Sequence, residues 1–234
     1  MGSRSDRENI PKQIEIGGKN KMPDNNKVKY GLKNVHYAIV TESESEGVVT
    51  SSYGTVKSWP GAISLSLDST AEKAVTRADD SDYFVTFGQG GYEGDLECAL
   101  IPDEVRTAVL GFKTDDNGVL VEDSSSFSNV VYIAMMFEFN GDVKATKHCL
   151  YKVSLSRPSI ASQTTGENGS IEPQTETVTL TAVPRADADQ LVHIQTKPTT
   201  DSAVVAAWYT AVPVPTFTTP TDDDDDDDDT NTTT

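Results

Sequence analysis

The sequence predicts a mainly-β protein, namely a β-sandwich with one flanking α-helix, a long projecting loop and an extended N-terminal arm. Several segments alternate apolar residues with small or polar ones at a period of two, which is typical of strands that bury one face. The segment Val130–Phe139 is apolar at nearly every position, which predicts a central strand covered on both sides. Asp116-Asn117-Gly118 and Asn140-Gly141 have the residues of tight hairpin turns.

Composition divides the 234 residues into three parts. Residues 1–27 are polar, contain several Gly and Pro, and lack periodicity, so we expect an extended arm. Residues 28–217 carry the strand patterns and form the predicted sandwich domain. Residues 218–234 include the run Asp222–Asp229, whose self-repulsion predicts a disordered acidic tail.

Within the sandwich domain, residues 28–40 predict the first strand because they are rich in β-branched and aromatic residues. One α-helix is expected at Pro102–Leu110, where a proline opens the first turn and two acids follow it. A second short helix is expected at residues 202–209. The alternating strands are expected to point these residues to one side: Ile63, Leu65 and Leu67; Leu96, Cys98 and Leu100; Cys149, Tyr151, Val153 and Leu155; Val178, Leu180 and Ala182.

Residues 42–59 predict a projecting hairpin or a long projecting loop, because they are too many for a hairpin turn of ~2–5 residues. The segment mixes acids with apolar residues that would form an exposed apolar patch on an isolated subunit. We therefore expect it to contact a neighbouring subunit or ring, with aromatic residues as anchors and with isoleucines of the N-terminal arm as a second contact. The predicted contact residues are Val48, Val49, Tyr53, Val56, Trp59, Ile10, Ile14 and Ile16.

The chain is strongly acidic, with 19 Lys and Arg against 37 Asp and Glu and a net charge of −18. Such a chain should not wrap nucleic acid, since DNA binding is driven by basic side chains that neutralise phosphates. Acidity can simply keep the protein soluble, or it can form a wall along which DNA slides without binding. Asp68, Asp95 and Glu97 lie on the non-core side of predicted strands and are the candidates for such a wall.

No catalytic, metal or cofactor motif is evident. His36, His148 and His193 lie in separate strand-like segments without the spacing of metal ligands, so we expect no metal site. The glycine-dense residues 88–94 join two strand-like runs rather than a strand and a helix, so no phosphate cradle is expected. We accordingly expect no cofactor and no enzymatic activity.

Two further features bound the class of protein. Cys98 and Cys149 lie inside apolar strand-like runs, which indicates buried free thiols and folding in a reducing cytoplasm. No apolar run approaches the ~20 residues of a membrane span, so no membrane partner is expected.

Four blocks of residues follow one another in an order that resembles the major tail protein family of long-tailed phages infecting Gram-positive bacteria. The blocks are Lys29–Ala38, Tyr53–Ser66, Gly91–Val105 and Leu110-Gly111, and the similar region covers residues 28–212. The resemblance implies a sandwich with one flanking helix, six subunits in a ring, and rings stacked into a hollow tube. It also implies that one sheet of each subunit joins its neighbours into a continuous inner barrel.

The function implied by this resemblance is that of a structural tail-tube subunit through which DNA is ejected. The implied partners are other copies of the chain, a tape-measure protein, tail terminator or initiator proteins, and genomic DNA that passes through the lumen without specific binding. The implied location is the phage tail of the virion, after assembly in the host cytoplasm.

Two other classes of function stay open at this point. The chain could be a capsid decoration or host-binding β-sandwich, which would be displayed and not polymerised. It could also be a hydrolase that uses a carboxylate pair, for which Asp79/Asp80 and Asp95/Glu97 are the available pairs. Neither pair belongs to a recognisable catalytic arrangement, and acids in solvated turns or along a lumen explain them better.

Overall fold

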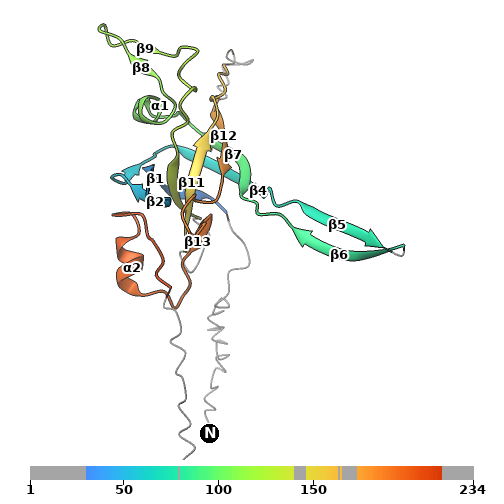
Figure 1. The fold of residues 1–234 in the computed structure, drawn as a ribbon. Helices are drawn as coiled ribbons and strands as arrows, with labels where there is room; N and C mark the ends of the chain where they lie inside the picture. Colours follow the sequence, from blue (N-terminus) through green and yellow to red (C-terminus); the bar gives the residue numbers. More distant parts are fainter. Residues whose placement is uncertain (1–29, 79, 140–145, 163, 165–172, 218–234) are drawn as a thin grey trace, which may run out of the picture.

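The computed structural model describes residues 30–78, 80–139, 146–162, 164 and 173–217 (Figure 1). The predicted N-terminal arm and acidic tail, with Ile10, Ile14 and Ile16, lie outside these residues, as does the predicted turn at Asn140-Gly141. The described part of the chain is mainly β, which confirms the predicted fold class.

Nine strands form one antiparallel sheet in the spatial order β2-β1-β10-β11-β12-β7-β4, with β3 beside β1 and β13 beside β11. Two separate hairpins, β5–β6 and β8–β9, complete the strands. The bounds are β1 (Leu32–Ser45), β2 (Val48–Tyr53), β3 (Lys57–Ser58), β4 (Ala62–Ser69), β5 (Lys73–Ala78), β6 (Ser81–Phe87), β7 (Tyr92–Cys98), β8 (Lys113–Thr114), β9 (Leu120–Val121), β10 (Ile133–Phe139), β11 (Lys147–Leu155), β12 (Glu176–Ala182) and β13 (His193–Gln195).

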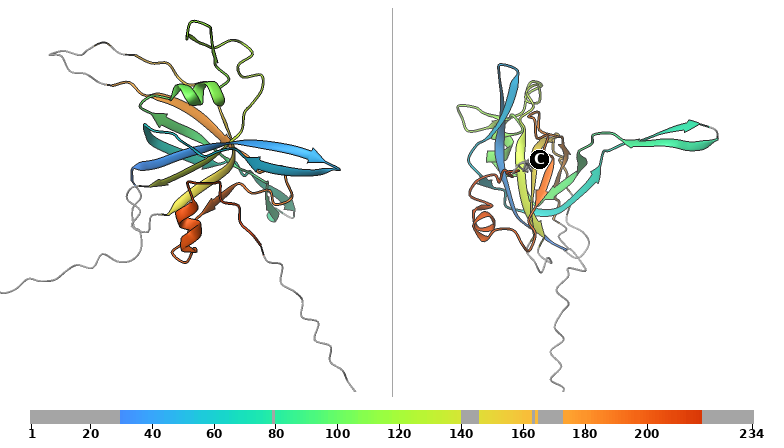
Figure 2. Two further views of the ribbon diagram at one scale, coloured as in Figure 1. Left: turned by 90° about the vertical axis from the view of Figure 1, so that its left-hand side faces the viewer. Right: turned by 60° about the horizontal axis from the view of Figure 1, so that its bottom comes forward.

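The large sheet twists and curls around its own core, as the two views of Figure 2 show. Strands β1 and β4, which are far apart in the sheet order, come close to one another because of this curl. The strands therefore enclose a core within one curled sheet, where the sequence predicts two packed sheets. The inner core includes Tyr37, Trp59, Leu96, Cys98, Ile101, Leu110, Ile133, Met135, Phe137, Leu150, Val153, Val178 and Leu180.

A second apolar cluster lies on the opposite face of the central strands. It contains Met136 of β10, Cys149 and Tyr151 of β11, and Trp208, all of them buried. Trp208 directly follows α2 (Ser202–Ala207), whose first turn is capped by Asp201 Oδ1 accepting from the backbone N–H of Ala203 over 2.7 Å. Strand β10 is therefore buried on both faces, as its apolar sequence predicts.

The predicted flanking helix is also present. Helix α1 (Asp103–Ala108) follows Pro102, and two acids occupy its first turn, where they complement the partial positive charge of the helix N-terminus. Val105 of this helix is buried in the inner core. With α2, the described part of the chain has two short helices, where the sequence predicts one flanking helix and a second, shorter one near the C-terminus.

Two β-bulges change the faces that simple alternation predicts. In β4 the register shifts between Ala62 and Ser64, and the extra residue, Ile63, is left 44% exposed instead of joining the core. In β11 two residues, Tyr151 and Lys152, oppose one residue of β10, so that Tyr151 packs in the outer cluster while Val153 packs in the inner core. The prediction that Tyr151 and Val153 share a face is wrong for this reason.

Of the two predicted forms of residues 42–59, the structure shows the hairpin and not the long loop. These residues belong mostly to β1, β2 and β3, and a two-residue turn at Glu46-Gly47, with φ of 53° and 79°, joins β1 to β2. Positive φ at both central residues matches the right-handed twist of the flanking strands, and glycine adopts it without steric strain. The β5–β6 hairpin also stands away from the body (Figure 1).

Trp59 is the residue at which the contact prediction fails most clearly. Its side chain is 1% exposed and meets the ring of Tyr37 edge to face, with 6.0 Å between ring centroids. Its backbone N–H donates to the carbonyl of Val35 over 2.8 Å. Trp59 is thus part of the inner core and is not available to a neighbouring subunit.

We expect Trp59→Ala to lower the free energy of unfolding by about 3–5 kcal/mol, because it removes a large side chain from a closed core. Val48→Ala, at a side chain that is 65% exposed, should change it by less than about 0.5 kcal/mol. Urea denaturation of the two variants measures both values. Equal stabilities for the two variants would contradict the core position of Trp59.

Candidate interaction surfaces

The outward face of β4, β7 and β12 consists of acidic side chains and of serine and threonine side chains. Cross-strand pairing places nine such residues in three rows, while the residues between them, such as Leu65, Leu96 and Val178, point into the core. We call this surface the polar face. Its rows are Asp68, Glu93 and Thr181; Ser66, Asp95 and Thr179; Ser64, Glu97 and Thr177.

Asp68, Asp95 and Glu97 therefore share the side opposite the core, as the alternation predicts, and none of the nine positions carries a basic residue. Gly94 does not disturb this register. A Cβ at Gly94 would come within 1.8 Å of the carbonyl oxygen of Ser66, so only glycine fits between β4 and β7 at this position.

Hydroxyl groups hold the carboxylates of the polar face in place. Thr175 Oγ1 donates to Glu97 Oε1 over 2.7 Å, and Ser64 Oγ donates to Glu97 Oε2 over 2.9 Å. The hydrogen bond from Thr175, followed by that from Ser64, lowers the pKa of Glu97 below its ordinary value. Thr179 Oγ1 donates to Asp95 Oδ1 over 2.9 Å in the same way. The face is thus both anionic and ordered.

The β1–β2 hairpin is fastened to the body by polar contacts. Lys152 Nζ lies 2.6 Å from Glu42 Oε2, and the backbone N–H of Ala186 donates to Glu42 Oε1 over 3.2 Å. Arg185 Nη1 donates to Tyr53 Oη over 3.1 Å. Burial raises the pKa of Tyr53, so its hydroxyl stays protonated while it accepts this hydrogen bond.

The structure shows which of the predicted contact residues are exposed to a partner. Tyr53 and Val56 are half-buried and pack against the outer cluster of their own chain, and Trp59 lies in the inner core. Val49 is half-buried, and Val48, beside the turn, is 65% exposed. Among the predicted contact residues that the structure describes, Val48 therefore has the side chain that is most open to a partner.

The β5–β6 hairpin exposes apolar side chains that sequence reasoning missed. Tyr83 is 76% exposed, Phe84 58% and Phe87 67%, and Val75 and Val85 are also exposed. Thr76 pairs with Phe84 and Arg77 pairs with Asp82, so Tyr83 is the extra residue of a bulge near the tip. The signal in the sequence was the apolar run from Tyr83 to Val85, which has no counterpart pattern in β5.

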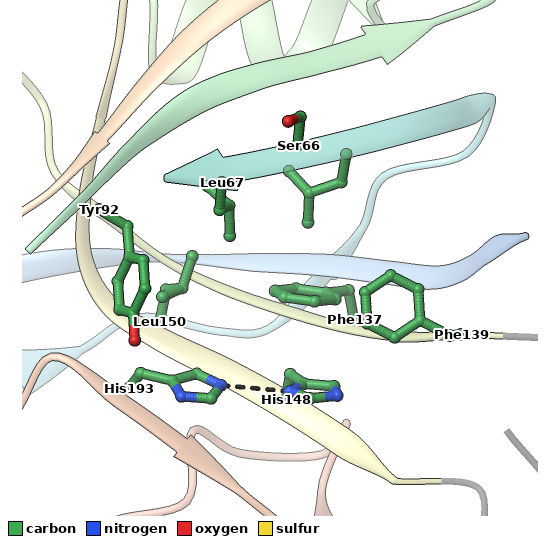
Figure 3. A pocket seen from close by; sticks show the side chains of 9 residues that line it. Ser66, Leu67, Tyr92, Phe137, Phe139, His148, Leu150 and His193 are labelled. Carbon is green, nitrogen blue, oxygen red and sulfur yellow. Dashed lines mark hydrogen bonds between the residues drawn. The ribbon is translucent and has the colours of Figure 1, made fainter. Parts of the chain in front are cut away.

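An apolar pocket of about 390 Å³ lies at the base of this hairpin (Figure 3). Leu67 of β4 and Tyr92 of β7 line it at the point where the hairpin leaves the sheet, and Phe137 and Phe139 line it from β10. His148 of β11 and His193 of β13 form one wall, where their rings stack and His148 Nδ1 lies 3.1 Å from His193 Nε2. The sequence places these histidines 45 residues apart, and the β11–β13 pairing brings them together.

The described residues contain no group of three or more His, Cys, Asp or Glu side chains that could hold a metal ion. Both thiols are fully buried. Burial raises the pKa of the Cys98 thiol to about 11 and raises that of Cys149 as well, which disfavours the reactive thiolate. Across the same part of the chain, every helix is too short or too polar to span a membrane.

The hydrogen bonds to Glu97 predict how its pKa responds when the donating hydroxyls are removed. Because the folded pKa of Glu97 is lowered, its stabilising effect is present above the unfolded pKa and is lost as pH falls through the folded pKa. We expect Ser64→Ala combined with Thr175→Val to bring the pKa of Glu97 up to its ordinary range. NMR titration of the Glu97 carboxyl carbon measures this shift. Ser52→Ala, which removes a hydroxyl donating to the carbonyl of Thr41, is the control and should leave the titration unchanged.

Neither a protein-family model nor a curated protein sequence matches the chain. Among solved structures, the chain is similar to one in the six-fold symmetrised baseplate of the anti-feeding prophage. The identity is 9%, the match covers 71% of this chain and 95% of that one, and the TM-score is 0.37. A chain in the sheath/tube terminator of an extracellular contractile injection system, in its extended state, matches at 13% identity over 70% of this chain and 94% of that one, with a TM-score of 0.38. Because both TM-scores lie below 0.5, this likeness does not assign a function.

Proposed function

We propose that this protein is a structural subunit of a phage tail, and more specifically the major subunit of the tail tube, which polymerises as stacked six-membered rings around a channel for DNA. The observation that carries the proposal is the polar face of β4, β7 and β12, with four acids and no basic residue. A wall of this sign repels the phosphate backbone, so DNA can slide along it without binding.

The geometry of the sheet supports polymerisation. Strand β4 ends the sheet and no other described strand pairs with its outer edge. It has eight residues and contains neither Lys nor Pro, the residues that commonly protect an exposed edge from pairing. Pairing of β4 with the neighbouring copy would cover this edge and extend the polar face from one subunit to the next. A head-to-tail contact of this kind closes into a ring when its rotation permits.

The proposed partners follow from this role. They are other copies of the chain, a tape-measure protein, tail terminator or initiator proteins, and genomic DNA that passes without specific binding. The proposed subunit has no catalytic role, belongs to the tail of the virion, and assembles in the host cytoplasm. Val48 at the exposed end of the β1–β2 hairpin is proposed as a contact to the next ring, and Ile10, Ile14 and Ile16 of the arm as a further contact.

Electron cryo-microscopy of the purified protein at high concentration, alone and with tail initiators, tests the proposal. We expect stacked six-fold rings with the polar face around the central channel. Monomers or trimers under every condition would contradict the tube and would favour a decoration or host-binding module. Rings with the polar face on the outer surface would contradict its role as the channel wall.

Chemical labelling in solution tests the position of the polar face independently. Asp95→Cys adds one accessible thiol, because both native thiols are buried. In the free subunit this thiol should react with a small maleimide and with a maleimide attached to a carrier wider than the channel. In assembled tubes only the small reagent should react, whereas Asn117→Cys, in the exposed turn between β8 and β9, should react with both. Equal reaction of Asp95→Cys with the carrier in tubes would show that the face is external.

A further inference from the structure

The large apolar side chains of the β5–β6 hairpin do not join either hydrophobic core of the described chain. The two strands pair only with each other, and the large side chains of β6 are exposed near the tip and near the base. An isolated two-stranded hairpin is marginally stable in water, and one with exposed aromatic rings is less soluble as well. A contact with a partner would remove both disadvantages.

The pocket at the base of the hairpin offers matching chemistry. Its walls are leucine, phenylalanine, tyrosine and imidazole side chains, and aromatic rings pack favourably edge to face or offset against such walls. Rings already meet in this manner around it. Phe137 stacks on His148 with 5.2 Å between centroids, and Tyr92 meets His193 edge to face at 6.2 Å. Its volume of about 390 Å³ lies in the range that pockets of this kind use to enclose a ligand group.

We propose that the tip of the β5–β6 hairpin of one copy, through Tyr83 and Phe84, docks into the pocket formed by Leu67, Tyr92, Phe137, Phe139, His148 and His193 of a second copy. The proposal names one contact by which copies join, so it rests on the proposed self-association of the chain. The bulge at Tyr83 turns its side chain out of the regular alternation, as bulges do, and so presents two neighbouring rings at the tip.

A hairpin tip docked in this pocket would belong to a second copy, because of the hairpin's own geometry. Seven residues of β6 span about 20 Å at the rise of a strand, and the pocket lies at the base, beside the ends of β4 and β7. The tip is therefore held away from the pocket of its own chain, and Figure 1 shows the β5–β6 hairpin extending away from the large sheet. A patch on one part of a molecule that fits a pocket on another part makes a head-to-tail contact, which yields rings or filaments.

Other hollows of the described surface suit the hairpin less well. The hollow over the polar face is lined by Asp68, Glu93 and Asp95, whose charges would lose solvation beneath an aromatic ring. A groove beside α2 is lined in part by Lys147 and Lys197 and offers no aromatic side chain.

Inter-copy cross-linking tests the contact. A tagged copy with Ser81→Cys, an exposed position two residues before Tyr83, is mixed with an untagged copy with Tyr92→Cys, and a short bis-maleimide is added under assembling conditions. The buried native thiols should not compete. We expect a dimer of one tagged and one untagged copy. Replacing Tyr92→Cys by Leu100→Cys, at a side chain that is 64% exposed elsewhere on the molecule, should give only background cross-linking.

A second measurement uses assembly itself. We expect Tyr83→Ser combined with Phe84→Ser to raise the protein concentration needed for assembly by about tenfold or more, since aromatic anchors in pockets dominate interfaces. Val119→Ser removes an exposed apolar side chain of the β8–β9 hairpin and should leave that concentration unchanged. Circular dichroism checks that each variant is folded.

The outcomes separate this inference from the proposed function. Tubes that form with background cross-linking and with normal assembly of the serine variant would overturn the hairpin contact and leave the tube function standing, with another segment in the pocket. Specific cross-linking in oligomers that are not stacked rings would support the hairpin contact and contradict the tube. A chain that stays monomeric without specific cross-linking at every concentration would overturn both.

Discussion

The constraint on which this structure depends is that β10 buries both of its faces. Met135 and Phe137 pack in the inner core, and Met136 packs in the outer cluster, so the strand needs cover on two sides. The curl of the sheet covers one side, and the segment after α2, with Trp208, covers the other. Because the outer layer is taken up at β10 and β11, the exposed polar face is formed at the other end of the sheet, on β4, β7 and β12.

A buried charge at the end of β10 is paired with residues of both neighbouring strands. Glu138, 4% exposed at the end of β10, lies 3.5 Å from both Lys33 and Lys147 and accepts from Asn34 Nδ2. Burial raises the pKa of Tyr209, and the negative charge of Glu138 raises it further. The ring of Tyr209 lies beneath Lys147 Nζ. A buried carboxylate without such partners would be strongly destabilising, so these contacts stabilise the end of β10 between β1 and β11.

The sequence predicted those parts of the fold that follow from local pattern. Period-two alternation placed Leu96 and Val178 inside and Asp95 and Glu97 outside, because β7 and β12 are regular and one face meets water. Alternation failed at Ile63 and Tyr151, since a bulge has no signature in hydrophobicity. A hairpin at residues 42–59 was predicted only as an alternative to a long loop, because the strand residues beside the Glu46-Gly47 turn are largely polar. The histidine pocket depends on the pairing of β11 with β13, which no local pattern encodes.

The two surfaces that the sheet leaves open have opposite chemistry, and the topology keeps them apart. The polar face is anionic and hydroxyl-rich, which favours water and repels other anions. The hairpin that grows from the ends of β4 and β7 is apolar and aromatic, which favours burial against protein. Since β4 and β7 supply the polar face and also carry the hairpin, an attraction acting through the hairpin would fix the orientation of the polar face in every copy. A single strand pair thus links the contact between subunits to the lining that those contacts would create.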